Sequence, residues 1–169
     1  MNQLKNRTIL VVGGTGFIGI NLIKKLLTLG AKVTCLSLHS NYKKINHKNL
    51  KYIFCDYTDL NILKRKISKP YAYVINLGGY INHSKYFDKG RLVIDDHFLS
   101  TMNLVSLVRR KELKRYLHVG TCDEYGANKS PIKESYKEDP ITPYAFAKLA
   151  SIKLLIMLYK SENFPSTIL

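Results

Sequence analysis

The sequence has 169 residues, the usual length of a single domain, and 46% of them are hydrophobic, which excludes a wholly disordered chain. Lys and Arg number 27 against 12 Asp and Glu, so the formal net charge is +15. The three cysteines form no Cys-x-x-Cys pair, which argues against a disulfide-stapled secreted scaffold and against a cysteine zinc site.

Neither a membrane span nor a leader is visible in the sequence. No apolar run approaches the roughly 20 residues that cross a bilayer, and the first ten residues lack the apolar core of a signal peptide. We therefore expect one domain over residues 1–169, located in the cytoplasm, with no metal and no membrane partner.

The positive charge has two interpretations, a nucleic-acid partner or a lysine-rich composition spread over a solvated surface. The basic residues occur in ones, twos and threes, and no nucleic-acid-binding motif accompanies them. This distribution favours the second interpretation, without a nucleic-acid partner. In either case a positive field attracts anionic small molecules, including nucleotides.

Short β-branched runs alternate with amphipathic stretches along the chain. The pattern predicts strands at Thr8–Val12, Lys32–Leu38, Lys51–Cys55, Tyr71–Leu77, Arg115–Gly120 and Ser166–Leu169. It predicts helices at Phe17–Leu29, Leu60–Ile67, Asp95–Lys111 and Pro143–Ser161, the last with Thr142 as N-cap. In the third helix, Phe98, Met102 and Val105 fall at helical spacing and are expected in the core. Strand–helix alternation with apolar strands predicts an α/β fold, a doubly wound, Rossmann-like parallel sheet with helices on both faces.

A glycine-rich turn follows the first predicted strand and opens the first predicted helix. Its glycines, Gly13, Gly16 and Gly19, permit a tight turn, close approach of a pyrophosphate and close packing of helix on strand. The helix N-terminus, at Phe17 and Ile18, offers backbone N–H groups and a positive dipole end to phosphates. This context predicts a dinucleotide-binding loop.

The end of the second predicted strand bears on the choice between NAD and NADP. NAD-binding domains usually place a carboxylate there for the ribose 2′-hydroxyl, whereas this sequence has Ser37 and His39, followed by Lys43 and Lys44. These groups suit a 2′-phosphate, which favours NADP over NAD. After the third strand, Asp56 is either an adenine contact or a turn-forming residue, and Tyr57 beside it is a further cofactor candidate.

Tyr144 and Lys148 lie one helical turn apart in the last predicted helix. A lysine ammonium near a phenol favours the phenolate, so such a pair can move a proton on or off a sugar hydroxyl or carbonyl. Thr121 follows the fifth predicted strand, at the sheet edge where open parallel sheets bind ligands. Its hydroxyl can therefore bond the same substrate oxygen as Tyr144.

Together these motifs resemble the extended short-chain dehydrogenase/reductases, in the NAD-dependent epimerase/dehydratase group. The resemblance rests on Gly-Gly-Thr-Gly-Phe-Ile-Gly, Thr-x-x-x-Tyr-Gly and Pro-Tyr-x-x-x-Lys, in that order, and on Asn76-Leu77-Gly78-Gly79 after the fourth strand. It implies that Leu77, Gly78 and Gly79 contact the cofactor. It also implies that Thr121 positions the substrate oxygen, that Tyr144 is the acid/base, and that Lys148 holds Tyr144 and the nicotinamide ribose.

The resemblance implies hydride exchange at a carbon of a nucleotide-activated sugar, and departures from the family pattern narrow the reaction. The 4,6-dehydratases of the family typically carry an acidic pair or a Ser-Glu pair after the catalytic Thr, where this sequence has Cys122 and Asp123. We therefore expect an epimerase or a 4-keto-reductase rather than a dehydratase. His97 stands where many relatives have Asn, and His83 is a further candidate contact near the nicotinamide.

The family's substrate-binding half follows the sixth strand, where this sequence ends at Leu169. We accordingly expect this sequence to be the cofactor-binding half alone. If it is not part of an enzyme, the alternative is a non-catalytic NAD(P)-binding module. The helix after the fourth strand often pairs with its copy in this family, which implies a homodimer.

Overall fold

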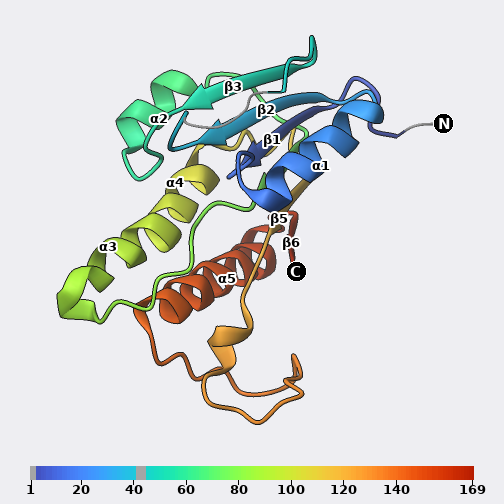
Figure 1. Cartoon of the computed structure of the whole chain (residues 1–169). Coiled ribbons are helices and arrows are strands. Elements are labelled where there is room, and N and C mark those ends of the chain that lie inside the picture. Colours follow the sequence, from blue (N-terminus) through green and yellow to red (C-terminus); the bar gives the residue numbers. More distant parts are fainter. Residues whose placement is uncertain (1–2, 41–44) are drawn as a thin grey trace.

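The computed structural model describes residues 3–40 and 45–169 of the chain (Figure 1). Lys43 and Lys44, two of the candidate 2′-phosphate contacts, lie outside the described residues. The fold is a six-stranded parallel sheet with the strand order β3-β2-β1-β4-β5-β6. The strands are β1 (Thr8–Val12), β2 (Lys32–Ser37), β3 (Leu50–Phe54), β4 (Tyr73–Asn76), β5 (Arg115–His118) and β6 (Ser166–Ile168).

Helices cover both faces of the sheet, as the alternating pattern predicts. The helices are α1 (Phe17–Thr28), α2 (Leu60–Lys66), α3 (Arg91–Ile94), α4 (Ser100–Leu107) and α5 (Pro143–Glu162). One face packs on α1 through Ile23, Leu26 and Leu27. The other face packs on α2, α4 and α5 through Leu63, Leu104 and Leu155. The doubly wound Rossmann-like fold is therefore confirmed.

The strand order reverses direction at β1, which has β2 on one side and β4 on the other. Chain connections leave the sheet in opposite directions from this point, and open α/β sheets bind ligands there, outside the carboxyl ends of the strands. The glycine turn at the end of β1 and the Leu77–Gly79 segment after β4 both lie at this switch point.

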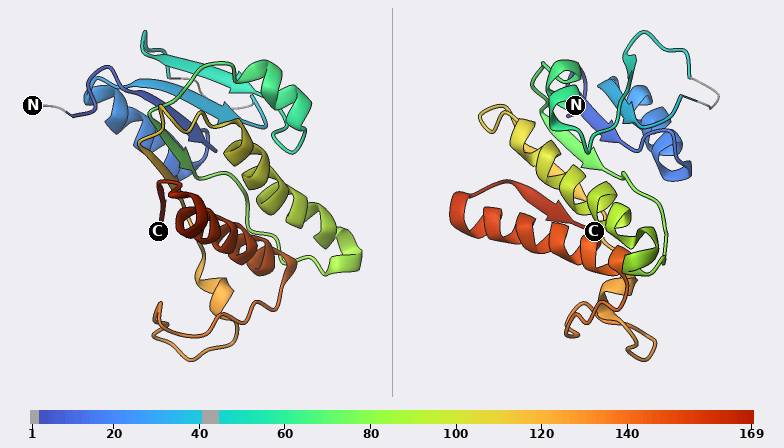
Figure 2. Two further views of the ribbon diagram at one scale, coloured as in Figure 1. Left: turned by 180° about the vertical axis from the view of Figure 1, so that it is seen from behind. Right: turned by 90° about the vertical axis from the view of Figure 1, so that its left-hand side faces the viewer.

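The helix after β4 differs from the prediction of a single helix over Asp95–Lys111. A turn at Tyr86–Gly90 (η1) leads into α3, a wide π-type turn (η2, Asp95–Leu99) follows, and α4 ends at Leu107. Figures 1 and 2 show α3 and α4 running as one rod beside α5.

The predicted core side of this helix is confirmed only in part. Val105 packs against the core, whereas Met102 is 36% exposed and Phe98 is only partly buried. The buried residues are Val93, His97, Ser100, Thr101, Asn103 and Leu104.

Side-chain caps fix where two other helices begin. The Thr142 hydroxyl accepts a hydrogen bond from the Ala145 N–H (3.1 Å), which confirms the predicted N-cap of α5 and starts that helix one residue before Tyr144. The Asp59 carboxylate accepts from the N–H groups of Asn61 and Ile62 at the start of α2. Between β5 and α5 lie a short 3₁₀ turn, η3 (Cys122–Tyr125), and a loop over residues 126–141 that projects from the body of the molecule (Figures 1 and 2).

Candidate functional site

The glycine turn after β1 has a backbone that side chains would obstruct. Gly13 has a φ of +71°, and a Cβ there would lie 2.8 Å from the Leu77 carbonyl oxygen. A Cβ on Gly19 would lie 2.5 Å from the Gly13 carbonyl oxygen, so this glycine serves helix–strand packing. Gly16 is the N-cap of α1 and makes no side-chain cap, and a Cβ on it would meet only the Gly13 carbonyl oxygen, at 3.4 Å. The backbone N-terminus of α1 therefore faces its surroundings without a capping side chain.

A cleft of about 400 Å³ opens beside this turn, at the switch point of the sheet. Eight residues expected to bind the cofactor line it: Gly13, Gly16, Ser37, His39, Asp56, Tyr57, Leu77 and Gly79. Thr15, Leu38, Thr58, Tyr80 and Asp96 complete its lining. The volume falls in the range of small-molecule sites.

The end of β2 supplies one buried and one exposed polar side chain to the cleft. Ser37 is buried and accepts a hydrogen bond from the Thr15 hydroxyl (3.0 Å), while His39 is exposed. After β3, Asp56 accepts from the N–H and the hydroxyl of Thr58 (2.8 and 2.7 Å). Asp56 is therefore a turn-forming residue and a lining residue of the cleft at once.

A smaller cavity of about 130 Å³ adjoins the cleft and holds the Tyr–Lys pair. The two share Leu77, Gly79 and Tyr80 as lining residues. The smaller one is also lined by Ile18, Gly78, Ile81, His97, Val119, Gly120, Tyr144 and Lys148. Phe17, Gly19 and Thr121, which sequence reasoning places at the site, line neither cavity, and the Phe17 side chain is 86% exposed.

Tyr144 is 8% exposed and lies between two histidine rings. Its ring meets that of His97 edge-on at 5.1 Å between centroids and that of His83 at 5.8 Å. His83 was expected near the nicotinamide, and its place beside the Tyr144 ring is consistent with that expectation. His83 also lies 3.8 Å from a carboxylate oxygen of Asp123.

Lys148 is 6% exposed and donates a hydrogen bond to the Val119 carbonyl at the end of β5. Burial lowers the pKa of Lys148 to about 8, and the Glu124 carboxylate opposes part of that effect. The side chain is therefore mostly an ammonium at neutral pH and becomes neutral just above it.

Thr121 caps the 3₁₀ turn η3. Its hydroxyl accepts a hydrogen bond from the Asp123 N–H (3.3 Å), and the Glu124 carboxylate accepts from the Thr121 N–H (3.3 Å). Glu124 is buried, and burial raises its pKa. The turn holds Thr121 at the carboxyl end of β5, and the hydroxyl hydrogen stays available for a further bond.

A buried polar cluster lies behind the Tyr–Lys pair. His118 on β5 lies 3.3 Å from the Asn76 amide through Nδ1, and burial with nearby Lys148 lowers the pKa of His118 to about 3. His97 contacts the Tyr80 carbonyl oxygen through Nε2 at 3.0 Å, and burial also lowers its pKa. Among the described residues, His97 Nδ1 and His118 Nε2 find no hydrogen-bond partner. Both histidines are neutral at physiological pH.

The model of the NAD-dependent epimerase/dehydratase family matches residues 9–169. The chain belongs to this family. It is similar to the ADP-L-glycero-D-manno-heptose-6-epimerase of Brachyspira hyodysenteriae, with 28% identity over 95% of this chain and 52% of that protein. It is also similar to the dTDP-D-glucose 4,6-dehydratase of Dictyostelium discoideum, with 25% identity over 93% of this chain and 41% of that protein.

Solved structures agree with the family's fold. An epimerase from the methanogen Methanothermobacter thermautotrophicus superposes with a TM-score of 0.87 and 23% identity, over 99% of this chain and 52% of that one. The chain thus spans about half the length of the relatives it matches. Within the described residues, no helix is long and apolar enough to cross a membrane.

Sequence reasoning did not place several cavity-lining residues of this family member at the site. Tyr80 and Asp96 join across the cleft, where the Tyr80 hydroxyl donates to an Asp96 carboxylate oxygen (2.8 Å). Tyr80 and Ile81 directly follow Gly79, so extending the segment after β4 by two residues would have found them. Nothing in the local sequence around Asp96 separates it from an ordinary surface carboxylate.

Proposed function

We propose that the protein containing this chain is an NAD(P)-dependent epimerase or 4-keto-reductase acting on a nucleotide-activated sugar. The observation that carries the proposal is the position of Tyr144 and Lys148. Both line a small cavity that adjoins the cleft of the glycine turn. The family, the similar epimerase and the similar dehydratase support a reaction of this general kind.

The residues present fit a dinucleotide. The glycine turn has no side chain where a pyrophosphate approaches, and the uncapped N-terminus of α1 favours negative charge there. Ser37, His39 and Asp56 lie at the end of the cleft that would hold the adenosine ribose, and Gly78, Gly79 and Lys148 lie toward the nicotinamide end. When bound, the dinucleotide supplies an acceptor and donor of hydride.

Tyr144 is the residue that would move the proton. Lys148 lies one helical turn away in the same cavity and would be its cationic partner. In its deprotonated form Tyr144 would accept a proton from a sugar hydroxyl, and in its protonated form it would return one when a carbonyl is reduced. Thr121, held by its turn at the end of β5, orients that sugar oxygen through its hydroxyl.

Among the family's reactions, dehydration is the less favoured proposal. Cys122 and Asp123 occupy the positions after Thr121, and the Cys122 thiol lies 3.7 Å from an Asp123 carboxylate oxygen. Asp123 also faces His83. A long general base such as glutamate is absent at these two positions, which favours an epimerase or a 4-keto-reductase.

We also propose NADP as the preferred cofactor, on the strength of His39. This side chain lines the cleft directly after β2, where NAD-binding domains usually carry a carboxylate and this chain carries none. The Asp56 carboxylate of the same cleft follows β3 and is hydrogen-bonded to Thr58. Location in the cytoplasm stays a prediction.

A homodimer is part of the same proposal. The exposed apolar side chains Leu92 and Met102 lie on α3 and α4, Phe146 and Met157 lie on α5, and α3 packs against α5. Sedimentation of a monomer at concentrations well above micromolar would contradict it.

The decisive variant is Tyr144→Phe, which removes only the phenol oxygen. We expect it to lower kcat for a nucleotide sugar in the complete protein by about a hundredfold or more, because general acid–base catalysis contributes at least that much to the rate. Cofactor affinity should stay close to that of the wild type. Full activity in this variant would refute the mechanism and favour a non-catalytic NAD(P)-binding module.

A further inference from the structure

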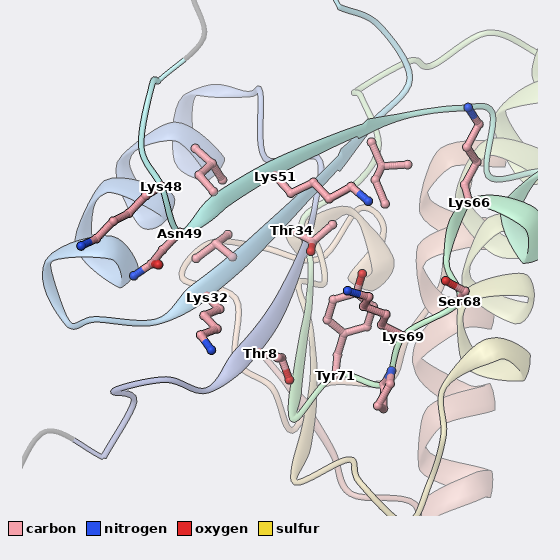
Figure 3. A pocket seen from close by; sticks show the side chains of 14 residues that line it. Thr8, Lys32, Thr34, Lys48, Asn49, Lys51, Lys66, Ser68, Lys69 and Tyr71 are labelled. Carbon is pink, nitrogen blue, oxygen red and sulfur yellow. The ribbon is translucent and has the colours of Figure 1, made fainter.

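A third cavity, of about 390 Å³, lies at the opposite edge of the sheet from the cofactor cleft. It is bounded by the amino ends of β1, β2 and β3 and by the segment that joins α2 to β4 (Figure 3). It shares no lining residue with the cleft or with the cavity of Tyr144. We call it the lysine cavity, because its lining includes Lys32, Lys48, Lys51, Lys66 and Lys69.

The cavity lies on the side of the sheet that packs against α2, α4 and α5, at the amino ends of the strands, where the side chains change from apolar to polar. Along this side, Leu10, Leu36 and Ile53 belong to the apolar core. Two residues earlier in each strand, the same side presents Thr8, Thr34 and Lys51. The register places Thr8 beside Lys32 and Thr34 beside Lys51, so cations and hydroxyls are interleaved at this edge.

The charge in the lysine cavity is uncompensated. All five lysines are exposed, and no carboxylate is among the lining residues. None of the five takes part in an ion pair within the described part of the chain. Arg109 adds a further cation, because its guanidinium donates to the Ser68 backbone carbonyl on the rim (3.2 Å). Like charges gathered in this way repel one another, and a bound anion relieves that repulsion.

Two of the lysines reach over the middle of the cavity. Figure 3 shows Lys69 reaching the Tyr71 ring and Lys51 lying along β3 above it, while the other three lie around the margin. Tyr71 and Thr34 both line the cavity and form part of its floor. The floor is thus partly aromatic and the rim cationic.

We propose that the lysine cavity binds a small organic molecule carrying two or more phosphate groups. Its volume suits a small molecule, its rim matches several phosphate charges, and its apolar floor suits an organic moiety. A nucleic acid fits less well, because it needs an extended basic groove with several stacking aromatics. This site is independent of the proposed function and would hold whatever the reaction is.

The test is a calorimetric titration of the chain with inorganic triphosphate. We compare the wild type with K51Q/K69Q and with a matched control, K24Q/K160Q, which removes the same charge from exposed lysines on α1 and α5. We expect saturable one-site binding that weakens about tenfold or more in K51Q/K69Q and at most about twofold in the control. The tighter of any NADPH binding events, which we assign to the cofactor cleft, should have the same affinity in all three proteins, which separates the lysine cavity from that cleft.

Several results would overturn the proposal. Equal weakening in both double variants would show a diffuse effect of net charge, and unchanged binding in K51Q/K69Q would place the triphosphate elsewhere. Absence of triphosphate binding in the wild type would also exclude the site. Tighter binding of a short single-stranded DNA through the same two lysines would replace the small molecule with a nucleic acid.

Discussion

Lys148 places an ammonium group in a nearly water-free part of the protein, beside Tyr144. Burial of that charge lowers the pKa of Lys148, which means that the folded state carries it at a cost in free energy. Its partners, the Val119 carbonyl and the Glu124 carboxylate, offset only part of the cost. A residue kept at such a cost is typical of a functional site.

We therefore expect Lys148→Met to raise the free energy of unfolding at pH 7 by about 1–2 kcal/mol while turnover is lost. The gain is smaller than the full electrostatic cost, because the Val119 carbonyl loses its partner. Urea unfolding monitored by circular dichroism measures the change. Lys24→Met, at an exposed position on α1, is the control and should change stability little. A destabilised Lys148→Met protein would contradict this view of the buried charge.

The buried histidines lead to a separate prediction about the stability of the protein in acid. The pKa of His118 is about 3 in the folded protein, well below the value of 6.5 for a free histidine. The unfolded state therefore binds a proton that the folded state does not, so stability is lost as the pH falls from about 6.5 toward 3. Each pH unit in that window costs up to about 1.4 kcal/mol for His118, and His97 acts in the same direction.

His118→Gln should flatten this pH dependence, since glutamine cannot take up the proton. Urea unfolding at pH 7.5, 6 and 5 measures the free energy of unfolding at each pH, and the expected difference is about 1 kcal/mol per pH unit. His39→Gln, at an exposed position, serves as the matched control and should leave the profile unchanged. An unchanged profile in His118→Gln would show that other groups, such as His97 or carboxylates, and not this histidine, set the acid lability.

At the scale of elements, different glycines of the turn after β1 serve folding and cofactor binding. Gly19 packs against the Gly13 and Gly14 backbone, whereas the space beside Gly16 is nearly open. Gly19→Ala should lower stability by about 2 kcal/mol or more, because neighbouring backbone must move. Gly16→Ala should change stability by less than about 0.5 kcal/mol and still weaken NADPH binding, because its methyl group lies at the N-terminus of α1.

Thermal unfolding and a calorimetric titration of both variants check this pair of outcomes. Gly30→Ala provides a reference for backbone strain alone, since Gly30 has a φ of +75° and lines no part of the cleft. Normal NADPH affinity in Gly16→Ala would mean that the cofactor does not approach this turn.

The same scale shows where sequence reasoning works and where it fails. The strand–turn–helix pattern around Gly13, and the cap at Thr142, depend on local residues and were predicted correctly. Part of the buried side of the helix after β4 was predicted wrongly, because it carries polar residues that an apolar pattern does not detect. Ser100 and Thr101 bond to carbonyls of their own helix, and Asn103 bonds to the Tyr57 and Thr58 carbonyls.

A π-type turn at Asp95–Leu99 interrupts the same helix. The apolar pattern places Phe98 and Met102 in the core, whereas His97 and Thr101, one position earlier, are the residues that are buried. The contact of His97 with Tyr144 was not predictable from the spacing of apolar residues.

At the scale of the whole molecule, the two ends of the parallel sheet have different chemistry. The carboxyl edge holds the glycine turn, the cleft and the Tyr–Lys pair, and the amino edge holds the lysine cavity. The net charge of +15 predicted attraction for anions in general. Which lysines converge depends on strand register and on the α2–β4 connection, so only the folded chain shows it.

The most direct measurement is a calorimetric titration of this chain with NADPH and then with NADH. We predict saturable binding at one site. NADPH should bind more tightly than NADH, because the residue that lines the cleft after β2 is His39 and not a carboxylate. Parity, or tighter binding of NADH, would overturn the NADP assignment and favour an epimerase over a reductase. Absence of binding by either dinucleotide would contradict the central claim that the glycine turn and the adjoining Tyr–Lys cavity form a cofactor site in this chain.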